Sequence, residues 1–132
     1  MKYYHEIKSY PLKDGSEYTY DSGYNISELP IGKPVYGFAY DVNDDTLQSR
    51  LRCLPVLGEI NKRYQYYDNV YSFFPYKKGT SEKRNTGSVD VQSRMYADTY
   101  EEAIEMYNEL VQKRIDNLYC MIKDAEQDKI KE

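Results

Sequence analysis

Hydrophobic and aromatic residues recur with a strand-like period over the first 96 residues, and with a helical period after that. Tyrosines partly alternate with other residues in KYYHEIKSY and SEYTYDSGY, and the Asp14-Gly15 turn between these segments predicts a hairpin. Three further runs rich in aromatic and aliphatic residues read as strands: VYGFAYDV, LRCLPVLGEI and YQYYDNVYSFF. Residues 1–96 are therefore predicted to form an antiparallel β-sheet.

Two of these predicted strands contain residues that restrict how the strand can pair or pack. Pro55 cannot donate to a strand ladder, so its strand should lie at an edge or contain a bulge. Phe73 and Phe74 are adjacent, so in a strand they point to opposite faces and only one of them can enter the same core.

The segment GSVDVQSRMY is predicted to be one more strand. Its residues Val89, Val91 and Met95 would share the apolar face. Arg94 and Tyr96 would then project from the opposite, open side of the sheet.

From Thr99 the pattern becomes helical, with the capping-box pair Thr99 and Glu102 at its start. The apolar positions advance by three or four: Ile104, Tyr107, Val111, Ile115, Leu118, Ile122 and Ala125. An unbroken helix to Asp128 would be about 45 Å long, against a radius of gyration near 14 Å for a compact chain of this size. Either the helix breaks near residues 116–118, or its stripe packs against a second copy of the chain.

The expected fold class is therefore α+β, with an N-terminal antiparallel β-sheet followed by one long or two shorter C-terminal α-helices. A length of 132 residues suits a single domain, with a β-rich part over 1–96 and a helical, oligomerising part over 99–128. No apolar run approaches the ~20 residues of a membrane span, and the first residues lack the apolar stretch of a secretory signal. We expect a cytoplasmic protein with no membrane partner.

Metal and cofactor signals are weak. Cys53 and Cys120 lie far apart and His5 is the only histidine, which leaves one chain short of zinc ligands. The segment from Asp41 has the first spacings of a calcium loop but carries Thr46 and Arg52 where such a loop needs glycine and glutamate. No serine or cysteine has a visible partner base, so neither an enzyme nor a cofactor is expected.

The composition points to ligand binding of another kind. Seventeen tyrosines can form half-buried surfaces and planar binding walls, besides filling a small core. The net charge of −4 hides an asymmetry, because eight cations and three acids give residues 50–85 a charge of +5 and leave −9 elsewhere. A basic region in an acidic protein can hold a small anion while the remaining field discourages long nucleic acid.

Residues 72–103 combine the parts of a nucleotide site, although the chain has no phosphate-loop or dinucleotide fingerprint. A basic loop with two glycines joins a strand that ends near Phe74 to the segment that carries Arg94, and this segment leads to a helix N-terminus. These parts could supply a ring for stacking, guanidinium groups for phosphates and free backbone donors.

Four segments in order resemble the phage-encoded anti-Thoeris sponges: KPVYGFAYDV, LPVLGEI, FFPYKKGT and SRMYADTYEEAIEMYNELVQKRIDNL. These cover most of residues 33–118. The resemblance implies a non-enzymatic homo-oligomer in the host cytoplasm. Such an oligomer encloses a cyclic ADP-ribose signal made by host TIR-domain proteins and thereby inhibits antiphage defence.

On the matching segments, the resemblance implies Phe74 for stacking, Arg94 and Arg52 for phosphates, and Tyr76 and Asn85 from the loop. The loop from Gly79 to Ser88 is short beside the family pattern. Some relatives also hold cyclic oligonucleotides at a separate site, to which no residue here is assigned.

Roles without a ligand remain open for the same residues. Phe74 can be a core residue, Arg94 can pair with Asp90, and Lys77 and Lys78 can be solvated. The chain could instead be a small phage inhibitor that binds a host defence protein, like an anti-CRISPR or a nucleic-acid mimic, through its tyrosines and acidic surface. Binding of single-stranded RNA is a third possibility, which the overall acidity disfavours.

Overall fold

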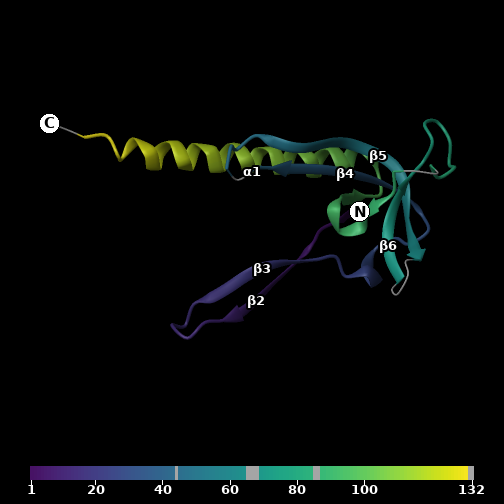
Figure 1. The fold of residues 1–132 in the computed structure, drawn as a ribbon, viewed down its shortest axis with the longest axis horizontal. Coiled ribbons are helices and arrows are strands. Elements are labelled where there is room, and N and C mark those ends of the chain that lie inside the picture. Colours follow the sequence, from purple (N-terminus) through teal and green to yellow (C-terminus); the bar gives the residue numbers. More distant parts are fainter. Residues whose placement is uncertain (44, 65–68, 85–86, 131–132) are drawn as a thin grey trace.

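The computed structural model describes the chain except residues 44, 65–68, 85–86 and 131–132. It has the expected α+β architecture, in which an antiparallel sheet is followed by one C-terminal helix (Figure 1). The elements are β1 (Lys2–Tyr3), β2 (Glu6–Pro11), β3 (Glu17–Gly23), the 3-10 turn η1 (Ile26–Glu28), β4 (Pro34–Val42), β5 (Ser49–Tyr64), β6 (Asn69–Pro75), β7 (Val89–Asp90), the 3-10 turn η2 (Val91–Ser93), β8 (Met95–Ala97) and α1 (Tyr100–Glu126).

The main sheet has six strands in the order β1-β8-β4-β5-β6-β7. Its central strand β4 is buried on both faces, because successive side chains point in opposite directions. Phe38 faces α1 and packs with Ala97, Met106 and Tyr107. The opposite face holds a second cluster, formed by Tyr24, Leu29, Val35, Ile60, Phe73, Val91 and Tyr96.

Phe73 sits at the centre of this second cluster and packs directly on backbone. A Cβ atom built at Gly37 would lie 3.0 Å from the Phe73 ring, and one at Gly58 would lie 2.7 Å from it. At Gly58 the Cβ would also lie 2.5 Å from the Phe74 carbonyl, so this position requires glycine, whereas a side chain at Gly37 would be tightly packed against the ring. The two glycines therefore leave room for Phe73.

The predictions for Pro55 and for the two phenylalanines are confirmed. The register between β4 and β5 shifts so that Leu54 and Pro55 stand opposite Phe38 alone, which is a β-bulge. Pairing of β5 with β6 begins only at Gly58, beyond the proline. Phe73 is fully buried, whereas Phe74 is half-buried on the other face of β6.

The predicted single strand over residues 87–96 is wrong. The Asp90 side chain accepts a hydrogen bond from the Gln92 amide (2.8 Å) and caps the 3-10 turn η2, which separates β7 from β8. This turn breaks the alternation, so Tyr96 is completely buried instead of facing solvent. Its hydroxyl donates to the Val91 carbonyl (2.8 Å), and burial raises the pKa of Tyr96 well above its usual range.

The helix α1 is unbroken over 27 residues, so of the two alternatives the break near residues 116–118 does not occur. The predicted cap is confirmed: the Thr99 hydroxyl accepts a hydrogen bond from the Glu102 amide (3.2 Å) and donates to the Glu102 carboxylate (3.0 Å). The buried residues of α1 are Ala103, Met106 and Tyr107. Only Tyr107 belongs to the predicted apolar stripe, so the buried face differs from that prediction.

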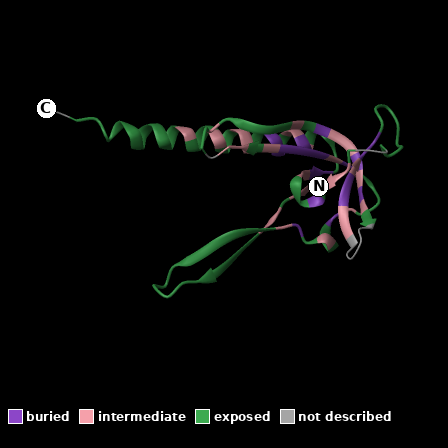
Figure 2. Ribbon diagram, in the orientation of Figure 1, coloured by how far each residue is buried: buried purple, intermediate pink, exposed green. Residues whose placement is uncertain are grey.

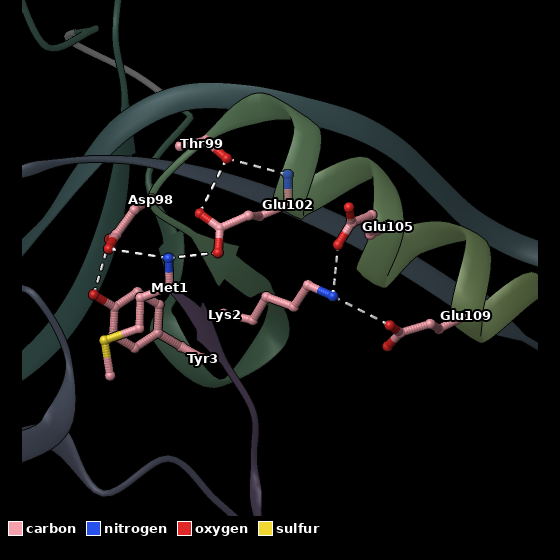
Figure 3. A network of polar contacts seen from close by, with 8 residues as sticks. All are labelled: Met1, Lys2, Tyr3, Asp98, Thr99, Glu102, Glu105 and Glu109. Carbon is pink, nitrogen blue, oxygen red and sulfur yellow. Dashed lines mark hydrogen bonds and ion pairs between the residues drawn. The ribbon is translucent and has the colours of Figure 1, made fainter.

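The first residues bind along the start of α1 (Figure 3). Lys2 pairs with Glu105 (2.7 Å) and Glu109 (3.4 Å), and the Tyr3 hydroxyl donates to Asp98 (2.8 Å). The hydrogen bond from Lys2 to Glu105 is the main cause of the raised pKa of the Lys2 ammonium. These contacts hold β1 against β8 at the edge of the sheet.

Two elements project from the packed body in the same direction (Figure 1). One is the hairpin β2–β3, which pairs with no other described strand and is exposed along nearly its whole length (Figure 2). The other is the C-terminal half of α1, where Ile115, Tyr119 and Ile122 are exposed. No helix among the described residues combines the length and the apolar character needed to cross a membrane.

Substitution of a buried and an exposed isoleucine tests which residues form the core. Ile60 is 0 % exposed and Ile130 is 92 % exposed. Ile60→Ala should lower the free energy of unfolding by about 2–5 kcal/mol because it leaves a cavity. The matched control Ile130→Ala should change it by less than about 0.5 kcal/mol. Urea unfolding followed by circular dichroism measures both, and equal losses would contradict the described packing.

Candidate ligand-binding site

A basic loop follows β6 and folds back on itself. Its start and end are joined by the bridge between Tyr76 and Lys83, and the Arg84 amide donates to the Pro75 carbonyl (2.8 Å). At its tip the Lys77 carbonyl accepts a hydrogen bond from the Thr80 amide (2.9 Å). Gly79 has a φ of +74°, a conformation that favours glycine.

This loop and the adjacent strand β5 enclose a half-open pocket of about 540 Å³. Its volume lies within the range of roughly 300–1,000 Å³ typical of small-molecule sites. Val56 and Leu57 form an apolar wall, and no carboxylate is among the described lining residues. The remaining lining residues are Tyr76, Lys77, Lys78, Gly79, Thr80 and Arg84. We call this cavity the basic-loop pocket.

One acidic residue beside the pocket fixes its tyrosine. Glu59 accepts a hydrogen bond from the Tyr76 hydroxyl (2.8 Å) and pairs with Lys83 (3.1 Å). Burial and the neighbouring carboxylate raise the pKa of Tyr76 to about 12. Burial alone would raise the pKa of Glu59, but the bonds from Tyr76 and Lys83 outweigh it and lower that pKa.

Phe74 lies next to this cluster on the outer face of β6, directly opposite Glu59 in the strand register. The Lys83 ammonium lies 5.4 Å from the centre of the Phe74 ring, within cation–π range. Phe74 and Tyr76, predicted from the sequence, thus lie together beside the basic-loop pocket.

Arg94 lies elsewhere. It follows η2, and its guanidinium donates to the Ser93 carbonyl (3.2 Å), not to Asp90. Arg94 lines a separate pocket of about 320 Å³ beneath α1, together with Phe38, Gln92 and Leu110.

His5 and Asp21 also line that second pocket, and the His5 Nδ1 and an Asp21 carboxylate oxygen are hydrogen-bonded at 3.0 Å. Tyr24 packs edge-on against the His5 ring, with the ring centroids 4.3 Å apart. The contacts of His5 therefore hold the base of the hairpin.

Arg52 belongs to a third region. It projects from β5 toward α1, where its guanidinium carbon lies 6.0 Å from the centre of the Tyr107 ring. Within one chain, Phe74, Arg94 and Arg52 therefore do not share one of the described pockets. Asn85 falls outside the described residues.

Lys77 and Lys78 are exposed, in agreement with their interpretation as solvated residues, and Lys77 pairs with Glu82 (3.4 Å). Both nevertheless line the basic-loop pocket, together with Arg84, which the sequence interpretation did not single out. The +5 charge of residues 50–85 was the signal that could have selected them. The described residues also contain no group of three or more His, Cys, Asp or Glu side chains placed to hold a metal ion.

The lowered pKa of Glu59 generates a prediction for acid stability. A carboxylate with a depressed pKa stabilises the fold above its ordinary value of 4.5, and this contribution is lost as the pH falls through the folded value. Glu59→Gln should therefore be destabilising at pH 7, and the difference from the wild type should shrink below about pH 4.5. Tyr76→Phe removes one partner and should weaken this pH dependence. Urea unfolding at pH 7, 5, 4 and 3 measures it, and a constant difference would contradict the ionised Glu59 cluster.

Comparisons with known proteins give no relative for this chain. No protein-family model, curated protein or solved structure matches it. The site is therefore defined by the residues and geometry of this chain.

Proposed function

We propose that this protein binds and sequesters a compact, phosphate-bearing nucleotide of the cyclic ADP-ribose type without transforming it. The main support is the basic-loop pocket, which combines Lys78 and Arg84 with an apolar wall, whereas Lys77 is paired with Glu82 (3.4 Å). Guanidinium and ammonium groups bind phosphate oxygens through charge-assisted hydrogen bonds. The Tyr76 ring and the adjacent Phe74 supply aromatic surface for a base or ribose.

The ordered segments that resemble anti-Thoeris sponges favour the same function. In that role the protein acts as a homo-oligomer in the infected cell, through its helical part, and removes a defence signal made by TIR-domain proteins. The ligand site is assigned here to the basic-loop pocket, with Tyr76 at its wall, in place of a site centred on Arg94 and Arg52.

A thermal shift screen tests ligand binding. Cyclic ADP-ribose isomers and cyclic dinucleotides serve as probes. A ligand at 100 times its dissociation constant should stabilise the fold by about 2.7 kcal/mol, which raises the Tm by several degrees. No shift with any of these probes would overturn the proposal.

Two cation variants locate the site. Lys78→Ala/Arg84→Ala should abolish the shift because it removes phosphate contacts from the basic-loop pocket. The control Lys8→Ala/Lys13→Ala removes the same charge from the hairpin and should leave the shift unchanged. Loss of the shift in Arg94→Ala alone would instead place the ligand in the pocket beneath α1.

Sequestration is separated from catalysis by the state of the ligand. The protein is loaded, heated to release the ligand, and the supernatant is analysed by chromatography. Recovery of the intact probe is expected, whereas a hydrolysed product would show an enzyme.

A second candidate function is direct inhibition of a host defence protein. It is favoured by the net charge of −9 outside residues 50–85 and by the exposed tyrosines of the hairpin. This function predicts a stable complex with a host protein and no nucleotide-dependent shift in Tm.

A further inference from the structure

The hairpin β2–β3 carries three tyrosines on one of its two faces. In its register Tyr10 lies opposite Tyr18, and Lys8 lies opposite Tyr20, so the three tyrosines share a face. Their ring centroids are 5.2 to 6.3 Å apart, and each tyrosine remains 41–50 % exposed. The cross-strand pair Ser9 and Thr19 lies on the other face. An isolated two-stranded hairpin is marginal in water, which indicates that the tyrosine face packs against a partner.

The base of this arm is fixed to the body. His5 and Asp21 pair across its two strands, and the Tyr24 amide donates to the Gln92 side chain (2.6 Å). Gly23 approaches the same Gln92 so closely that a Cβ atom would collide with it. Because the base is held at these points, the arm projects beside α1 without lying on it (Figure 1).

An apolar groove lies between the C-terminal half of α1 and the end of β4. Its volume is about 380 Å³, and its apolar lining includes Val42, Leu47, Leu118 and Met121. Arg114 ties the helix to the sheet by donating to the Tyr40 hydroxyl (3.0 Å) and to the Leu47 carbonyl. The groove is thus formed within the single chain.

We propose that the β2–β3 arm of one chain docks, by its tyrosine face, into the α1–β4 groove of a second copy. The arm and the helical wall of the groove have similar lengths. The seven residues of β3 extend about 23 Å, and the part of α1 beyond Lys113 extends about 20 Å.

The contact area favours a second copy over another protein. Three half-exposed tyrosines and Leu12 offer about 350–400 Å² of surface, since each aromatic side chain can bury roughly 150–250 Å². With an equal area on the groove, one docked arm buries about 750 Å², which is below the roughly 1,200 Å² of a stable interface. Two copies that exchange arms bury about 1,500 Å², within the standard range. This contact goes beyond the proposed ligand binding and does not depend on it.

Sedimentation equilibrium of the full chain tests the proposal. The wild type should be dimeric or larger at 10 µM. Tyr10→Ser/Tyr18→Ser/Tyr20→Ser on the arm and Leu118→Ser/Met121→Ser in the groove should each weaken association at least ~100-fold. The control Ser9→Ala/Thr19→Ala on the other face should associate like the wild type. A monomeric wild type, or a dimer unaffected by the tyrosine variant, would overturn the proposal.

Photo-cross-linking keeps the test independent of how the variants fold. Tyr18 is replaced by p-benzoylphenylalanine, and equal amounts of ¹⁴N- and ¹⁵N-labelled protein are mixed before irradiation. Cross-links from position 18 to residues 110–121 of the other isotopic form support arm exchange. Cross-links within one chain only, or to a different protein when a cell lysate is present, contradict it.

Discussion

The Phe73 ring packed on glycine backbone is the contact on which the rest of the structure depends. A Cβ atom would lie 3.0 Å from this ring at Gly37 and 2.7 Å from it at Gly58, so the two glycines leave room for the ring. Tyr96 completes the contact with its ring centroid 5.3 Å away. The cluster thus joins β6 to β8, the strand that leads into α1.

The inward direction of Phe73 also determines where the basic loop begins. Because Phe73 points inward, Phe74 must point outward, where it meets Lys83 beside the Glu59–Tyr76 pair. The basic loop continues directly from this edge. Arg94 is carried to the other side of β4 by η2 and β8, and its pocket lies beneath α1. Two cationic regions that are close in the sequence thus line different pockets.

Two described surfaces, the β2–β3 hairpin and the C-terminal half of α1, extend beyond the packed body of the molecule. The hairpin is clamped only at its base, and α1 continues beyond the part of the sheet that covers it (Figure 2). Both surfaces are apolar on one side, a character that in a stable protein is usually matched by an interface. The two proposals therefore concern different parts of the chain: the basic loop for ligand binding, and the two projections for self-association.

The sequence alone determined the hairpin, the capped helix, the opposite directions of Phe73 and Phe74, and that Pro55 needs either an edge strand or a bulge. Each of these is encoded within a few residues, by a turn pair, a cap, a missing donor or strand alternation. Only the tertiary structure decided that Tyr96 is buried and that Lys77, Lys78 and Arg84 share a pocket apart from Arg94. The physical reason is that the Asp90 cap shifts the strand phase, and the packing of Phe73 depends on glycines distant in the sequence.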